Sequence, residues 1–164
     1  MKAQNQTAIV AEKDKQEIYI TREFDAPREV VFKAYADPDI LVQWVGPHNR
    51  EMKIDRYDAR SGGSYRYFVC NDQGREIAAF NGVIHEVTAP ERIIQTFEYE
   101  GLPERGHVTL DTTTFEALPN NRTKVTTHSI FRSVADRNAM MQSGVEKGLN
   151  EGYQKLDALL AHKG

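Results

Sequence analysis

The first patterned part of the chain predicts a strand followed by two short helices. Apolar and polar side chains alternate over residues 18–25, which is typical of a strand with one buried face. Val30 and Ala34 then recur at helical spacing, and a second short apolar group ends at Trp44. Prolines precede each of these two groups, so we expect two separate helices there.

Between residues 52 and 131 the pattern changes to short runs rich in β-branched and aromatic residues. Glycine, asparagine and proline separate these runs, which is typical of an antiparallel meander. Gly82 lies inside one run, where a glycine often marks a bulge or bend that lets a sheet curl. The predicted strands cover residues 52–58, 63–70, 75–87, 92–100, 106–117 and 122–131.

The last patterned stretch, Val134 to His162, predicts one long helix with a broad apolar stripe. Three glycines at a spacing of four residues run beside this stripe. A glycine inside a helix costs about 1 kcal/mol relative to alanine, so the glycines predict either a close neighbour or an open groove. The stripe comprises Met141, Val145, Leu149, Tyr153, Leu156 and Leu160, and the glycines are Gly144, Gly148 and Gly152.

This order of elements predicts an α+β fold in which a curved antiparallel sheet wraps around the long C-terminal helix. The helix has one wide apolar face, and the sheet is the surface available to bury it. A cavity arises between helix and sheet wherever the lining residues are too small to fill the space.

Aromatic residues on the predicted strands indicate what such a cavity would hold. Tyr65 and Tyr67 share one strand face, since side chains alternate along a strand. A pocket lined by aromatics with a few polar groups suits a small organic ligand, although each of these residues could equally fill the core. The predicted cavity residues are Trp44, Tyr65, Tyr67, Phe80, Phe97, Met141, Val145, Gly148, Leu149 and Gly152.

Length and charge limit the class of protein. The chain has 164 residues and a net charge of −3, which favours one domain over residues 17–162 and gives no electrostatic case for nucleic acid. Residues 1–16 are polar and predict a disordered lead-in without a signal peptide. No apolar run reaches the roughly 18 residues of a membrane span, and Cys70 is the only cysteine, so we expect a cytoplasmic protein.

The sequence contains no recognisable catalytic, metal-binding or cofactor-binding motif, and we expect no catalytic residue, metal or cofactor. The five histidines show none of the short metal-ligand spacings. Glu86, Glu98, His107 and Asp111 lie on predicted strands, and a carboxylate facing an apolar cavity could move protons. The facing of Asp111, His107 and His128 stays open, because the strand register cannot be fixed from the pattern.

Five segments stand out in order along the chain, and they are ITREFDAPREVVFKAYADPDILVQWVGP, GGSYRYFV, FNGVIHEVTAPERI, TTTFEALPNNRTKVTTHSIF and MMQSGVEKGLNEGYQKLDALL. Together they resemble the SRPBCC superfamily, and within it the group similar to the C-terminal domain of heat-shock-protein-90 ATPase activators and to the calicheamicin-resistance protein. The resemblance implies the helix-grip, START-like fold and a cavity for apolar or amphipathic ligands. One departure is Trp44-Val45, where the family often shows two tryptophans.

Three functions follow as hypotheses. The first is binding of a small apolar, aromatic or lipid-like ligand in the cavity between sheet and helix. The second, by family likeness, is a stress-related co-chaperone-like interaction protein with a chaperone partner. The third is a cyclase- or hydrolase-like enzyme that uses the same cavity. The oligomeric state is left open.

Overall fold

The structure, a computed structural model, describes residues 5–163 and contains one curved antiparallel sheet with four helices. The strands are β1 (Ala8–Val10), β2 (Glu17–Phe24), β3 (Glu51–Tyr57), β4 (Ser64–Cys70), β5 (Glu76–Thr88), β6 (Arg92–Tyr99), β7 (Thr109–Leu118) and β8 (Arg122–Ile130). The helices are α1 (Arg28–Ala36), α2 (Pro38–Trp44), α3 (Val134–Gln142) and α4 (Val145–Lys163).

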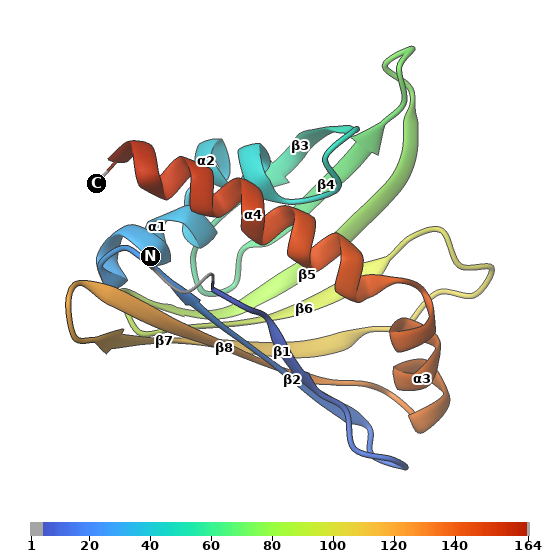
Figure 1. Cartoon of the computed structure of the whole chain (residues 1–164). Helices are drawn as coiled ribbons and strands as arrows, with labels where there is room; N and C mark the ends of the chain where they lie inside the picture. The colour runs from blue at the N-terminus through green and yellow to red at the C-terminus, as the bar shows by residue number, and fades with distance from the viewer. Residues whose placement is uncertain (1–4, 164) are drawn as a thin grey trace.

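The strands follow the order β1-β2-β8-β7-β6-β5-β4-β3, and every neighbouring pair is antiparallel. Figure 1 shows α4 running across one face of this sheet, with α1 and α2 at one end of it and α3 at the other. The α+β helix-grip prediction is therefore confirmed. Strands β3 to β8 begin and end within a few residues of their predicted positions.

Strand β1 lies inside the stretch that was predicted to be disordered. Ala8–Val10 pairs with β2, with Val10 opposite Tyr19, and Ile9 packs against the core. The prediction is wrong for these residues because a short apolar segment gains ladder hydrogen bonds at the free edge of β2. Residues 1–4 lie outside the described part of the chain.

The C-terminal stretch forms two helices rather than the single predicted one. Gly144 has a φ of +85°, a left-handed conformation that glycine adopts without steric cost and that ends helices. Ser133 caps the start of α3 by accepting a hydrogen bond from the Asp136 amide at 3.0 Å. Gly144 is thus the break between α3 and α4, and Met141 belongs to α3.

The main core lies between the helices and the half of the sheet formed by β2, β7 and β8. Phe24, Val31, Phe115 and Leu156 are buried together there. The indole Nε1 of Trp44 donates a hydrogen bond to a backbone carbonyl of α1 at 2.9 Å. The sheet half formed by β3 to β6 contributes few residues to this cluster, so its inner face is less completely covered.

A half-buried ion pair ties α4 to the sheet. The guanidinium of Arg22, a residue only 4% exposed, donates two hydrogen bonds to the Asp157 carboxylate at 2.8 and 2.7 Å. It also lies over the rings of Phe24 and Tyr153, 4.9 and 5.7 Å from their centroids. The two planar hydrogen bonds fix the position of α4 over β2.

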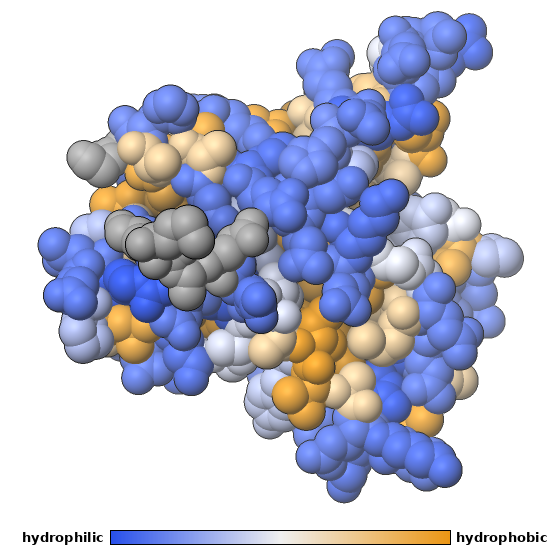
Figure 2. All heavy atoms as spheres, in the orientation of Figure 1, coloured by the Kyte–Doolittle hydropathy of each residue, from blue (hydrophilic) through white to orange (hydrophobic). Residues whose placement is uncertain are grey.

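The outward surface of α4 is mostly hydrophilic, as Figure 2 shows. Hydrophobic side chains gather below the middle of α4, over the region where Figure 1 draws β1 and β2. Within residues 5–163 none of the helices has the length and apolar character needed to cross a membrane.

Candidate functional site

The inner face of the sheet carries a continuous row of aromatic rings. Neighbouring ring centroids in this row lie 5.4 to 5.9 Å apart, within the range of favourable aromatic pairs. The row begins on β3, passes through β4 and β5, and ends on β6. We call it the aromatic row, and its members are Tyr57, Tyr65, Tyr67, Phe80 and Phe97.

Gly82 makes room for Tyr65, the second ring of the aromatic row. A Cβ placed on Gly82 would collide with the Tyr65 ring and with the carbonyl of Thr96. Tyr65 is 1% exposed, and its hydroxyl donates a hydrogen bond to that same carbonyl. Gly82 pairs with Tyr65 on β4, and the register shift on the β6 side falls between Ile84 and Glu86, so this glycine provides space for Tyr65 and is not itself the bulge.

Other rings of the row lie deep in the fold and yet keep accessible surface. Phe80 and Phe97 are half-buried, and so is Tyr67, even though dense surroundings raise the pKa of its hydroxyl far above the ordinary value. The main cause of that raised pKa is desolvation by burial, which disfavours the charged form. By the same cause, the pKa of Tyr57 rises to about 12.

A belt of polar side chains crosses the inner face beside the aromatic row. Gln95 pairs with Asp111 and Asp111 with Ser129, on the three neighbouring strands β6, β7 and β8. Thr113 and Thr127 extend the belt, and their hydroxyls lie 3.2 Å apart in a hydrogen bond. Side chains at paired positions point to the same face, and the neighbouring Ile18 is buried in the core. This polar belt therefore faces the helices.

Two oxygen atoms of the polar belt have no hydrogen-bond partner. They are Oδ1 of Asp111 and Oε1 of Gln95, both shielded from solvent. Burial raises the pKa of the Asp111 carboxyl, and the hydroxyls of Ser129 and Thr109 and the charge of His128 lower it by less. No lysine or arginine is among the groups that shift this pKa.

The other acid–base candidates are engaged on the outer face or at the edges of the sheet. Glu98 accepts hydrogen bonds from Arg105 at 3.1 Å and from a backbone amide at 2.7 Å, and Glu86 pairs with Arg92 at 2.7 Å. His107 contacts the Asp136 carboxylate of α3 at 2.9 Å.

His128 stacks on Tyr19, with ring centroids 4.3 Å apart, and it pairs with Glu17 at 2.7 Å. Tyr19 is exposed, so the His128 ring lies on the outer face. Among the candidates, Asp111 is thus the carboxyl that faces inward. Within residues 5–163, no three histidine, cysteine, aspartate or glutamate side chains gather as a metal site would need.

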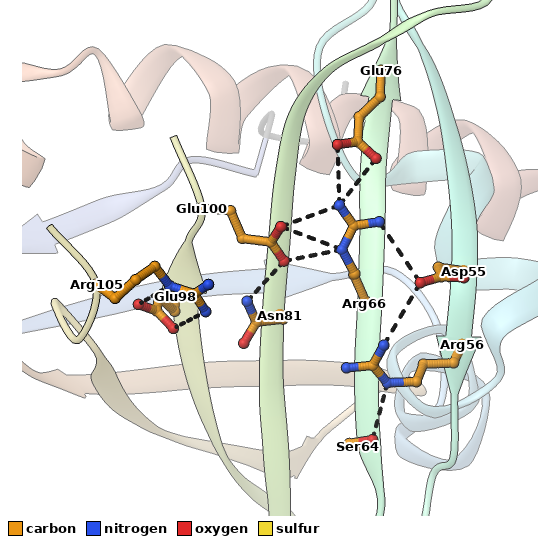
Figure 3. Close-up of polar contacts among 9 residues, drawn as sticks. All are labelled: Asp55, Arg56, Ser64, Arg66, Glu76, Asn81, Glu98, Glu100 and Arg105. Atoms are coloured by element: carbon orange, nitrogen blue, oxygen red, sulfur yellow. Dashed lines mark hydrogen bonds and ion pairs between the residues drawn. The ribbon is translucent and has the colours of Figure 1, made fainter. Parts of the chain in front are cut away.

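Figure 3 shows a network of paired charges on the outer face of β3 to β6. Arg66 donates hydrogen bonds to Glu100 and Glu76 at 3.0 Å and lies 3.7 Å from Asp55. Asn81 donates to Glu100 at 2.8 Å. Hydrogen bonds from Arg66 are the main reason why the pKa of Glu100 is lowered. The unpartnered oxygens of the polar belt, in contrast, lie on the opposite face of the sheet.

The structure brings together four of the predicted site residues and separates others from them. Tyr65, Tyr67, Phe80 and Phe97 are the members of the aromatic row that the sequence predicted. Tyr57 was missed, because its place beside Tyr65 depends on the β3–β4 register shift after Ile54. The alternation within residues 52–58 was the available signal.

Of the predicted residues from α2 and α4, some are packed between the two helices and one is exposed. Trp44 is buried against Tyr35 and Tyr153, and a Cβ on Gly152 would lie 3.1 Å from the Trp44 carbonyl. Gly152 therefore allows close packing of α4 on α2 rather than an opening. Gly148 is exposed, and a Cβ there would meet no atom within 4 Å.

The remaining predicted residues of the C-terminal helices lie at the edge of the core. Met141 and Leu149 are half-buried and pack against the core cluster, and Val145 at the start of α4 is also half-buried. A role of any predicted residue in ligand binding stays a prediction.

A separate open hollow lies beside α1. It is lined by Phe32, Lys33, Ala59 and Pro90, among others, and no member of the aromatic row or the polar belt contributes to it. Its lining offers neither a row of aromatic rings nor an unpartnered buried polar atom. We therefore place the candidate site on the inner face of the sheet.

A curved antiparallel sheet gripping a C-terminal helix, with mixed aromatic and polar residues on its inner face, defines a helix-grip protein of the SRPBCC type. Residues 25–161 match the family described as activator of Hsp90 ATPase homolog 1-like protein. The chain belongs to that family, which confirms the resemblance found in the sequence.

Solved structures of bacterial proteins share this fold over nearly the whole chain. A protein from Rhodobacter sphaeroides superposes with a TM-score of 0.85 at 22% identity, covering 96% of this chain and 99% of its own. One from Arthrobacter aurescens gives 0.82 at 25% identity, covering 94% and 91%. One from Mycobacterium smegmatis gives 0.81 at 25% identity, covering 97% and 100%. No match was found among curated proteins.

Proposed function

We propose that this protein binds a small apolar or aromatic ligand in a cavity between the inner face of β3 to β7 and α4. The observation that carries the proposal is the aromatic row. Its members Tyr67, Phe80 and Phe97 keep accessible surface although they face the interior of the fold. Side chains that lie deep and yet remain accessible are expected where a fold leaves space for a ligand.

Two further features support this proposal. The main core is concentrated under β2, β7 and β8, so α4 leaves the β3 to β6 half of the sheet less covered. Unpartnered acceptors of the polar belt, Asp111 Oδ1 and Gln95 Oε1, are the kind of polar groups that orient a ligand in an otherwise apolar pocket. The resemblance to the SRPBCC superfamily implies a cavity for apolar or amphipathic ligands, which agrees with this proposal.

Binding of 2-methoxynaphthalene, a neutral aromatic probe, tests this function by isothermal titration calorimetry. Phe80→Ala removes a ring that contacts both Tyr67 and Phe97, and it should weaken binding by about tenfold, as expected for the loss of one aromatic contact and its buried area. Phe68→Ala is the matched control, because Phe68 lies between inward positions on β4 and faces outward beside Arg66. Absence of probe binding, or equal loss in both variants, would count against the proposal.

A co-chaperone-like interaction is the second candidate, and the family match over residues 25–161 favours it. It rests on likeness alone, since fold does not determine function. Purified protein and purified heat-shock protein 90 should then form a complex and change the rate of ATP hydrolysis. No complex at concentrations of about 100 μM, well above the micromolar affinities of ordinary transient complexes, would remove this candidate.

An enzyme of cyclase or hydrolase type would use the same space. The inward carboxyl of Asp111 is the group that such chemistry needs, because its raised pKa suits proton transfer. Conversion of a bound ligand, lost in Asp111→Asn but retained in Glu98→Gln, would identify that activity.

A further inference from the structure

We propose that the ligand held against the aromatic row is an aromatic alcohol or phenol whose hydroxyl donates a hydrogen bond to Asp111, with Gln95 as the neighbouring acceptor. This inference rests on the proposed binding function and names its ligand class. It follows from the placement of the polar belt beside the aromatic row.

Two neighbouring side chains of the polar belt have unmet hydrogen-bonding capacity. Gln95 and Asp111 are directly paired across β6 and β7, so their side chains leave the same face of the sheet side by side. Oε1 of Gln95 and Oδ1 of Asp111 are both shielded from solvent, and neither accepts a hydrogen bond. Buried acceptors without donors are uncommon in folded proteins, which indicates a donor supplied from outside the chain.

The hydroxyl groups near these two acceptors are already engaged, so we infer that the missing donor comes from a ligand. Thr113 and Thr127 already bond each other at 3.2 Å. Tyr65 donates its proton to the carbonyl of Thr96. The hydroxyls of Ser129 and Thr109 form hydrogen bonds with the Asp111 carboxyl, and within residues 5–163 its Oδ1 atom still has no partner.

Charge also limits the ligand class. Within residues 5–163 no lysine or arginine shifts the pKa of Asp111, and the opposing charge is that of His128, which lies on the outer face. A ligand carboxylate would therefore meet an acidic side chain with no cation to offset the repulsion. A neutral hydroxyl avoids that repulsion and supplies the missing donor.

The polar belt lies beside the aromatic row. Phe97 follows Gln95 by two positions on β6 and so shares its face. Phe97 pairs with Thr109, two positions before Asp111 on β7, so the carboxyl lies beside the β6 end of the aromatic row. The charge of Asp111 also raises the pKa of both Tyr65 and Tyr67. A flat ring resting on the row thus has its hydroxyl within reach of Asp111.

The test compares 2-naphthol with 2-methoxynaphthalene and 2-naphthoate by calorimetry. The first two share one ring system and differ in the hydrogen-bond donor. We expect 2-naphthol to bind about tenfold more tightly than 2-methoxynaphthalene, as one buried hydrogen bond to a charged group supplies, and 2-naphthoate to bind most weakly. Equal affinity for the first two probes would overturn the inference and leave the binding function standing, whereas no binding of any probe would overturn both.

Two variants test which side chains cause the preference for 2-naphthol over 2-methoxynaphthalene. Asp111→Leu should abolish the preference for 2-naphthol while keeping the affinity for 2-methoxynaphthalene, and Gln95→Leu should reduce that preference. Thr112→Val, on the outer face of β7 beside Asp111, is the matched control and should keep the tenfold preference. A preference that survives in both Asp111→Leu and Gln95→Leu would overturn the inference, and Gln95→Leu decides alone if the Asp111 variant does not fold.

Discussion

The ring of Tyr65 lies against the backbone of Gly82, where a side chain on β5 would otherwise stand. This contact lets the Tyr65 hydroxyl cross β5 and reach the carbonyl of Thr96 on β6. One tyrosine therefore joins three strands and fixes the second ring of the aromatic row.

Gly82→Ala should destabilise the protein by about 1–3 kcal/mol, the usual cost of forcing extra volume into a packed site. The added methyl group would meet both the Tyr65 ring and the Thr96 carbonyl, so one of them must move. Urea denaturation measures the change. Val83→Ala is the control, because Val83 is 54% exposed and should change stability much less. Unchanged stability of Gly82→Ala would refute the close contact.

The two glycines inside α4 should respond oppositely to alanine. At Gly148 the new methyl group meets open space, so Gly148→Ala should stabilise the protein by about 0.5–1 kcal/mol through helix propensity. At Gly152 it would lie 3.1 Å from the Trp44 carbonyl, and the strained contact should cancel or reverse that gain. Thermal denaturation of both variants measures the difference, and equal stabilisation would show that α4 does not pack closely on α2.

Removing the carboxylate partner of the buried Arg22 guanidinium should cost more than removing both partners of the pair. Asp157→Ala leaves the Arg22 guanidinium, 4% exposed, without its carboxylate, and we expect a loss of about 3 kcal/mol. The double variant Arg22→Met and Asp157→Ala removes the uncompensated charge and should recover part of that loss. Urea denaturation of the single and double variants gives the coupling, and simple additivity would contradict it.

Because the pKa of Asp111 is raised in the folded state, this residue should make the protein less stable as the pH rises. Because burial holds this pKa above the unfolded value, the folded state binds the proton more tightly, and stability falls as pH rises from the ordinary aspartate pKa of about 4 through the folded value. Asp111→Asn cannot ionise, so its stability relative to the natural protein should increase over this range.

Glu98 provides the control of opposite sign. Hydrogen bonds from Arg105 and from the Gly106 amide lower its pKa, so its contribution is present above the unfolded pKa and is lost as pH falls through the folded value. Glu98→Gln should therefore lose stability relative to the natural protein as pH rises. Urea denaturation between about pH 3 and pH 7, a range that spans both carboxyl titrations, separates the two cases. If the stability of both variants relative to the natural protein changed in the same direction with pH, that result would contradict the inward placement of Asp111.

Much of the fold followed from local patterns. Alternation and turn residues located strands β3 to β8 because both depend on a few neighbouring residues. The α3–α4 break was missed, because Gly144 fits a helical spacing pattern and its left-handed φ of +85° is visible only in three dimensions. The short strand β1 was missed for a related reason, since its pairing depends on a partner edge that lies distant in the sequence.

The sequence by itself determined the helix-grip class, the strand order along the chain and four of the five rings in the aromatic row. The tertiary structure alone decided which residues meet. It placed Asp111 inward and His128 outward, turned Gly152 into a packing contact with Trp44, and left Gly148 open. The physical reason is that strand facing depends on long-range register, where a shift of one residue reverses every side chain.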